Sequence, residues 1–184
     1  VLFGIFFFNQ LYLILNSNWT LQESIPLHLC NLSYIMSCLL LINRKQFYFE
    51  WILYFGIASG INAVLTPELT HGVDIWKFFY FYISHALLII LPFIMIKYYN
   101  FFPRKHSWLK FFIIINSLVP FIYSINIFLN SNYMYLNQKP EANNPFLIGE
   151  WPWYILGLEF VVFIFLLIIY IPFVFLNKKR NIWI

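Results

Sequence analysis

Long apolar runs without charge constrain this chain more than any other feature of its sequence. Of its 184 residues, 62% are hydrophobic and only 10% are charged. A soluble domain carries roughly a quarter charged residues. Folding cannot hide the deficit, because a chain of this length still exposes a large surface. Most of that surface must therefore face lipid, and the sequence predicts an integral membrane protein.

Six apolar segments are long enough, or nearly so, to cross a membrane. About 20 predominantly apolar residues span a hydrocarbon core of roughly 30 Å. The runs are continuous and lack the alternating pattern of a membrane β-barrel, which favours helices. We therefore predict an all-α polytopic transmembrane bundle that forms one domain over residues 1–184. The predicted spans are about 1–15, 26–43, 47–65, 75–96, 109–130 and 152–176.

The first apolar run begins at Val1, with no methionine before it. It lacks the basic segment and the small-residue cleavage site of a secretory signal peptide. We therefore interpret it as a membrane span. We also expect the protein to continue beyond Val1, with a seventh span preceding the six.

The connections between the spans alternate in charge. Basic clusters follow the second, fourth and sixth spans, whereas the other connections are mostly acidic. Positively charged loops stay on the cytoplasmic side of a membrane. We therefore expect a multi-pass protein of the cell membrane whose C-terminus is cytoplasmic. The basic residues indicate topology and do not indicate binding to nucleic acid.

Polar side chains within the spans mark the candidate functional sites. They are costly in lipid, usually face the interior of the bundle, and are therefore the default functional candidates. Most lie in the half of the bundle that we assign to the outside, which predicts a polar cavity open to that side. Besides Cys30, His85 and Glu159, its candidates are His28, Asn31, Ser33, Asn62, Thr66, Glu68, Asn126 and Tyr133.

Cys30 and His85 form the candidate reactive pair. A helical rise of about 1.5 Å per residue puts Cys30 about 6 Å, Glu159 about 12 Å and His85 about 15 Å below the outer ends of their helices. The three therefore either share a layer or miss one another by a turn. His28 lies about 200° around an ideal helix from Cys30, which favours His85 as its partner. A thiol beside an imidazole can act as a nucleophile in acyl transfer through a thioester, with Glu159 orienting His85 or carrying a proton. The competing interpretation is an ordinary buried cysteine near residues that only form structural hydrogen bonds.

A zinc site is the other chemistry that these residue types suggest. Its ligands, from among His28, Cys30, Glu68 and His71, would have to converge from separate spans without any motif spacing. We therefore expect neither a metal nor a cofactor.

Several short motifs resemble those of YwaF-type bacterial integral membrane proteins. They lie at residues 25–33, 65–68, 84–86, 132–136, 139–140 and 149–154, and include Pro-Leu-His-Leu-Cys at 26–30. YwaF-type proteins are similar in turn to the eukaryotic transmembrane protein 164 family, which is proposed to transfer fatty acyl chains onto ether lysophospholipids through a Cys and a His. The resemblance implies Cys30 as nucleophile, His85 as base and membrane lipids as partners.

The sequence features are compatible with three functions. The first is a lipid acyltransferase or acyl hydrolase. The second is a small transporter or channel with a path along Asn62, His85, Asn126 and Glu159, although the cytoplasmic half offers few polar groups to continue it. The third is a non-catalytic membrane scaffold or lipid binder.

Overall fold

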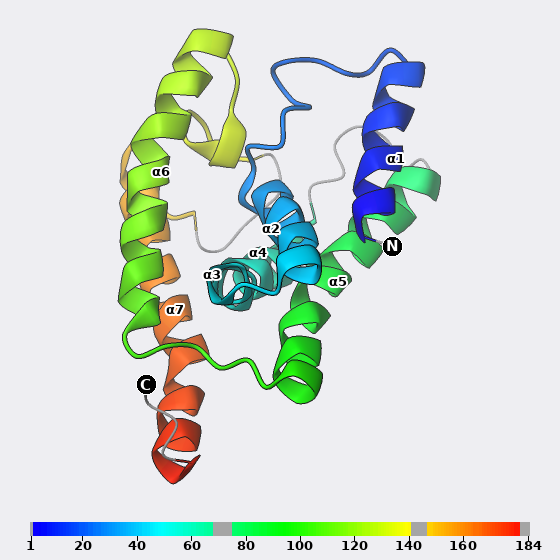
Figure 1. Ribbon diagram of the computed structural model, residues 1–184. Helices are drawn as coiled ribbons and strands as arrows, with labels where there is room; N and C mark the ends of the chain where they lie inside the picture. The colour runs from blue at the N-terminus through cyan, green and yellow to red at the C-terminus, as the bar shows by residue number, and fades with distance from the viewer. Residues whose placement is uncertain (1, 68–74, 141–146, 181–184) are drawn as a thin grey trace.

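The computed structural model describes residues 2–67, 75–140 and 147–180, and all regular elements within these ranges are helices (Figure 1). This confirms the predicted all-α fold class. The elements are α1 (Leu2–Leu15), α2 (Leu29–Asn43), α3 (Gln46–Trp51), η1 (Ile52–Gly56), α4 (Ile57–Leu65), α5 (Ile75–Tyr99), α6 (Ser107–Leu129), η2 (Tyr133–Tyr135) and α7 (Trp153–Arg180).

The apolar helices form a membrane bundle. Within the described ranges, four stretches are long and apolar enough to cross a bilayer, and α1 and α2 contribute shorter apolar helices. The four are Gln46–Leu65, Ile75–Tyr99, Ser107–Leu129 and Trp153–Leu176. The second predicted span, 26–43, is helical only from Leu29. Pro26 disfavours helical backbone in the residue before it, and His28 is extended, with φ −66° and ψ 147°.

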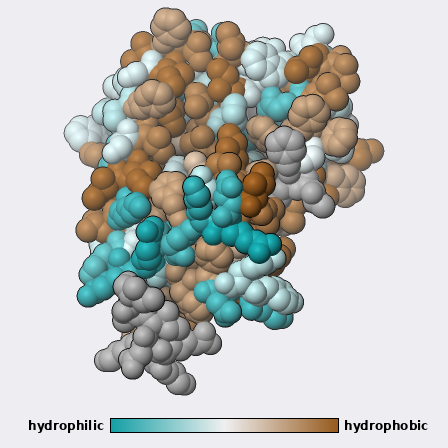
Figure 2. Space-filling view, viewed as in Figure 1, coloured by the Kyte–Doolittle hydropathy of each residue, from teal (hydrophilic) through white to brown (hydrophobic). Residues whose placement is uncertain are grey.

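The bundle has two ends with different character. Figure 1 shows the segment before α2 and the loop after α6 at the upper end, and the α5–α6 connection with the end of α7 at the lower end. Figure 2 shows an extensive apolar surface, with hydrophilic residues gathered in its lower part. Such a surface fits lipid around the helices and water at the basic connections.

The third span is the centre of the core. It runs through α3, η1 and α4, and the five residues of the π-helical turn η1 are all buried. Trp51 and Phe55 lie with ring centroids 5.0 Å apart, and Phe55 lies 5.7 Å from Phe111 of α6. These aromatic contacts join the third span to α6.

The third span approaches α5 closely at two glycines, Gly56 at the end of η1 and Gly60 in α4. A Cβ atom added to Gly60 would lie 3.0 Å from the carbonyl oxygen of His85 and 2.7 Å from Cγ1 of Ile89. A Cβ atom at Gly56 would lie 3.3 Å from the carbonyl oxygen of Leu88. Small residues permit such contact between membrane helices, and Gly60 thereby sets the position of the His85 backbone.

Changing Gly60 to alanine is expected to lower the free energy of unfolding by about 1–3 kcal/mol, because the added methyl group overpacks the α4–α5 contact. The measurement is unfolding of the purified protein in detergent. Gly4→Ala is the matched control, because a Cβ atom there has nothing within 4 Å and alanine is favoured over glycine in a helix. Equal stability of the two variants would contradict the close approach.

Candidate functional site

A cavity of about 560 Å³ lies within the upper part of the bundle, bordered by all six apolar helices and by η2. Its size falls within the range of small-molecule sites, roughly 300–1,000 Å³. Most of its lining is apolar, and seven of the predicted site residues also line it. They are His28, Cys30, Asn31, Asn62, Thr66, His85 and Glu159. The cavity is therefore suited to an apolar molecule that carries a few polar groups.

Cys30 lies in the first turn of α2 and is half-buried. It lines the cavity, whereas Cys38, two turns further along the same helix, does not contribute to the lining. Tyr80 of α5 lines the same cavity. The chain thus holds two cysteines on one helix, and only one of them faces the cavity.

His85 of α5 is held in one orientation and one tautomer. Its Nδ1 lies 2.7 Å from the carbonyl oxygen of Phe81. Because a carbonyl oxygen only accepts hydrogen bonds, Nδ1 must be the protonated nitrogen, which leaves the Nε2 lone pair of the neutral imidazole available as a base. The rings of Phe81 and Tyr34 lie 4.5 Å and 6.2 Å from the imidazole. Nε2 is the nitrogen that can take a proton at this site.

Glu159 of α7 belongs to the opposite wall of the cavity. It is half-buried, and it accepts a hydrogen bond of 2.9 Å from Nδ2 of Asn116 on α6. Its hydrogen bond is therefore made to α6 and not to His85, whose Nδ1 is occupied by Phe81. The three predicted catalytic residues share one cavity, but the carboxylate does not orient the imidazole in this structure.

A loop that contacts the segment before α2 borders the upper end of the cavity. Tyr133 Oη donates to the carbonyl oxygen of Leu21 at 2.7 Å and accepts from the Ile25 amide at 3.0 Å. Burial raises the pKa of the Tyr133 phenol, so it remains a donor. The Met134 amide donates to Nδ1 of His28 at 3.3 Å. Tyr133 and His28 thus join two distant segments above the cavity.

Two further candidates hold the core and the loop and are not part of the cavity lining. Asn126 is buried, accepts from the Tyr133 amide at 2.8 Å, and donates to the Tyr133 carbonyl at 2.9 Å. Ser33 accepts a hydrogen bond of 3.2 Å from Nε1 of Trp51. Glu68, and His71 of the zinc alternative, lie outside the described residues.

The metal alternative can be examined only in the part of the chain that is described. There, no group of three His, Cys, Asp or Glu side chains could hold a metal ion.

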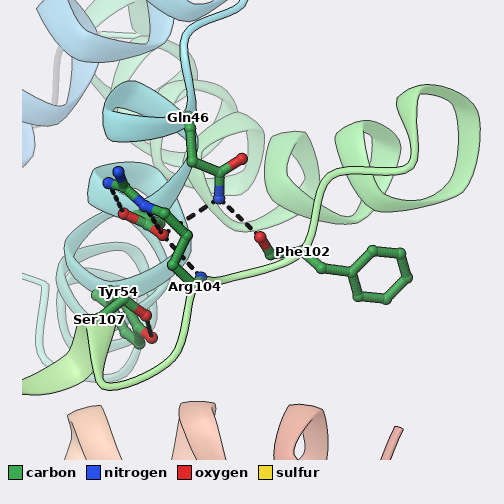
Figure 3. Close-up of polar contacts among 6 residues, drawn as sticks. Gln46, Tyr54, Phe102, Arg104 and Ser107 are labelled. Atoms are coloured by element: carbon green, nitrogen blue, oxygen red, sulfur yellow. Dashed lines mark hydrogen bonds and ion pairs between the residues drawn. The ribbon is translucent and has the colours of Figure 1, made fainter. Parts of the chain in front are cut away.

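A buried carboxylate at the other end of the bundle was missed by the sequence analysis. Glu50 of α3 is fully buried and accepts from Nε of Arg104 at 3.0 Å and from Nη2 at 2.6 Å. The Arg104 amide adds a third contact at 2.8 Å, and Nε2 of Gln46 donates both to Glu50, at 3.2 Å, and to the Phe102 carbonyl, at 2.6 Å (Figure 3). These hydrogen bonds to Glu50 raise the pKa of Arg104.

The Glu50 cluster fastens the α5–α6 connection to the start of the third span. Beside it, the hydroxyls of Tyr54 and Ser107 lie 2.6 Å apart and join η1 to the start of α6 (Figure 3). The signal that could have identified Glu50 is its place as a single acidic residue within the predicted span 47–65. An acidic residue in an apolar helix needs a cationic partner, and the basic connection after the fourth span supplies it.

The model of the TMEM164 family matches residues 1–170 of the chain. No curated protein and no solved structure matches it.

Proposed function

This chain belongs to the TMEM164 family, and from that premise we propose that it is a lipid acyltransferase or acyl hydrolase with Cys30 as nucleophile and His85 as general base. One observation carries the proposal. Cys30 and His85 line the same mostly apolar cavity, and the Phe81 carbonyl leaves Nε2 of His85 as the basic nitrogen.

The first half-reaction forms a thioester. His85 Nε2 takes the thiol proton while the Cys30 sulfur bonds to the carbonyl carbon of an acyl ester, and the C=O electron pair moves onto oxygen. When that pair returns, the bond from carbon to the glycerol oxygen breaks. The leaving alkoxide takes the proton from the imidazolium, which yields a lysolipid and an acyl group on Cys30.

The second half-reaction restores the thiol. A hydroxyl group of a lysophospholipid, or of water, attacks the thioester carbon while His85 takes its proton. The bond from carbon to sulfur breaks, and the thiolate recovers the proton from His85. A lysophospholipid acceptor gives acyl transfer and water gives hydrolysis. We assign Glu159 to the opposite wall as a hydrogen-bond acceptor for the incoming hydroxyl, supported by its place in the lining.

The proposal also includes the membrane, the orientation of the chain and the partners of this chemistry. The basic connections favour a cell-membrane protein with a cytoplasmic C-terminus, in which the cavity lies on the outer side. The motifs around residues 26–30 favour the YwaF-type branch of the family. Membrane lipids are the proposed partners, because an apolar cavity within a bundle receives them directly from the bilayer.

The proposal is tested by the reactivity of the two cysteines in native membranes. A thiol-reactive probe attached to a fatty acyl chain is expected to label Cys30 and to leave Cys38 unmodified, with the sites identified by mass spectrometry. The Cys38→Ser variant should be labelled like the wild type, and Cys30→Ala should not be labelled.

An unreactive Cys30 would overturn the enzymatic proposal. Solute flux through proteoliposomes that is lost on changing Glu159 to glutamine would then support a transporter. Absence of both labelling and flux would support a scaffold or lipid binder.

A further inference from the structure

His28 is the second histidine that lines the cavity, and its hydrogen bonding differs from that of His85. Nδ1 of His28 accepts a hydrogen bond of 3.3 Å from the Met134 amide. Because a backbone amide only donates, Nδ1 carries no proton, so the imidazole is neutral and its proton is on Nε2. In His85 the Phe81 carbonyl places the proton on Nδ1. The two imidazoles are therefore opposite tautomers, in which Nε2 of His85 is a base and Nε2 of His28 is an N–H donor.

The Nε2–H group of His28 is not used by the fold. Within the described part of the chain, the Met134 amide is the one hydrogen-bond partner of this imidazole. His28 is half-buried where it borders the mostly apolar cavity. A donor in such a place costs free energy when it has no partner, so it requires an explanation. A hydrogen-bond acceptor on the molecule that fills the cavity supplies one.

The imidazole of His28 is held in place by the three consecutive residues of η2. Met134 supplies the amide, and the rings of Tyr133 and Tyr135 each lie with centroids 5.3 Å from the imidazole. The Tyr133 hydroxyl is in turn hydrogen-bonded to the segment before α2. A donor that is oriented before the substrate arrives needs no reorganisation at the moment of reaction.

His28 also lies near Cys30 along the backbone. Two residues separate their Cα atoms by at most about 7 Å. The rotation of about 200° between them on an ideal helix does not apply, because His28 is extended and α2 begins at Leu29. The backbone therefore allows both side chains to reach the cavity, and both line it.

We propose that the Nε2–H group of His28 is the oxyanion donor of the thioester chemistry, with the carbonyl oxygen of an acyl lipid as its acceptor. The inference rests on the proposed function of Cys30 and His85. When the Cys30 sulfur bonds to the carbonyl carbon, the C=O electron pair moves onto oxygen, and the N–H group stabilises that charge by a hydrogen bond. The proton stays on Nε2. The pair returns as the glycerol oxygen leaves, so His28 is unchanged by the reaction.

Asparagine and glutamine separate the roles of the two ring nitrogens of His28. The side-chain amide of asparagine reaches the position of Nδ1, where its oxygen can accept from the Met134 amide, but it offers no donor at the position of Nε2. The side-chain amide of glutamine reaches the position of Nε2 and can donate there, but it leaves the Met134 amide without its acceptor. One variant therefore removes the proposed donor, and the other removes the structural contact.

The experiment measures Tm of the purified variants and acylation of Cys30 in proteoliposomes that contain a phospholipid with a labelled acyl chain. His28→Asn is expected to slow acylation by roughly 10²–10³-fold, as loss of one oxyanion donor does, without lowering Tm. His28→Gln is expected to lower Tm by about 2–4 °C through its lost hydrogen bond and yet to acylate faster than His28→Asn. Acylation by His28→Asn at or above the rate of His28→Gln would overturn the inference, because His28 would then act only by holding the loop.

Alkylation of Cys30 by iodoacetamide separates a role at the carbonyl oxygen from a role at the thiol. This displacement develops no oxyanion, so His28→Asn should be alkylated at the wild-type rate, whereas His85→Ala should be alkylated more slowly. Slower alkylation in His28→Asn would overturn the inference, because His28 would then act on the sulfur. Wild-type acylation in His28→Asn, alongside an inactive Cys30→Ala, would overturn it and leave the proposed function standing. No acylation of wild-type Cys30 would overturn both.

Discussion

Replacing Arg104 by alanine is expected to lower the free energy of unfolding by about 3–5 kcal/mol, the cost of leaving one partner of a buried ion pair uncompensated. The two partners are unequal, because the side chain of Glu50 is fully buried whereas that of Arg104 is 49% exposed. Loss of the arginine leaves the buried Glu50 carboxylate without a cationic partner. Loss of the carboxylate leaves a guanidinium that can turn to water. The Glu50→Gln variant is therefore expected to be less destabilised than Arg104→Ala.

This asymmetry is measured by unfolding the purified variants in detergent, together with the double variant Glu50→Gln/Arg104→Ala. The double variant should be more stable than Arg104→Ala alone, because the stranded charge is gone. Lys105→Ala is the matched control, since Lys105 is an exposed cation on the same connection and such changes are usually within ±0.5 kcal/mol. If Arg104→Ala proved as stable as Lys105→Ala, the cluster in Figure 3 would not fasten the connection.

Removal of the His85 imidazole is expected to lower the rate of acyl transfer by roughly 10²–10⁴-fold, the usual contribution of a general base. The physical reason is the tautomer that the Phe81 carbonyl imposes, with Nε2 as the available base. The measurement is transfer of a labelled acyl chain between lipids by His85→Ala in proteoliposomes, at equal amounts of folded protein.

His106→Asn provides the histidine control for this measurement. His106 is exposed just before α6, with φ 57°, a backbone conformation that asparagine tolerates. It lies outside the cavity lining, so the rate should remain that of the wild type. An equal loss of rate in His85→Ala and His106→Asn would indicate general damage to the protein and would contradict a chemical role for His85.

The helices could be predicted because lipid as a solvent leaves little choice of backbone structure. A continuous apolar run must satisfy its amides internally, so the positions of the long helices followed from hydropathy alone. The start of α2 could not be placed in this way. Residues 26–28 are not helical, and His28 is extended. From a distant loop, Tyr133 accepts from the Ile25 amide and Met134 donates to the His28 side chain.

The polar residues of the candidate site could be predicted from the sequence, but their hydrogen-bond partners could not. The cost of polar groups in lipid pointed to Cys30, His85 and Glu159, and all three line one cavity. Their hydrogen bonds depend on neighbouring helices, so the partners Phe81 and Asn116 could not be read from spacing.

The most direct measurement is the intact mass of the wild-type protein during turnover in proteoliposomes that contain a phospholipid donor and no lysophospholipid acceptor. An acyl thioester is expected on Cys30, released by neutral hydroxylamine, and absent from Cys30→Ala, which should also transfer no acyl chains when the acceptor is supplied. Acyl transfer that continues in Cys30→Ala, or that proceeds in the wild type without any acyl group on Cys30, would contradict the account.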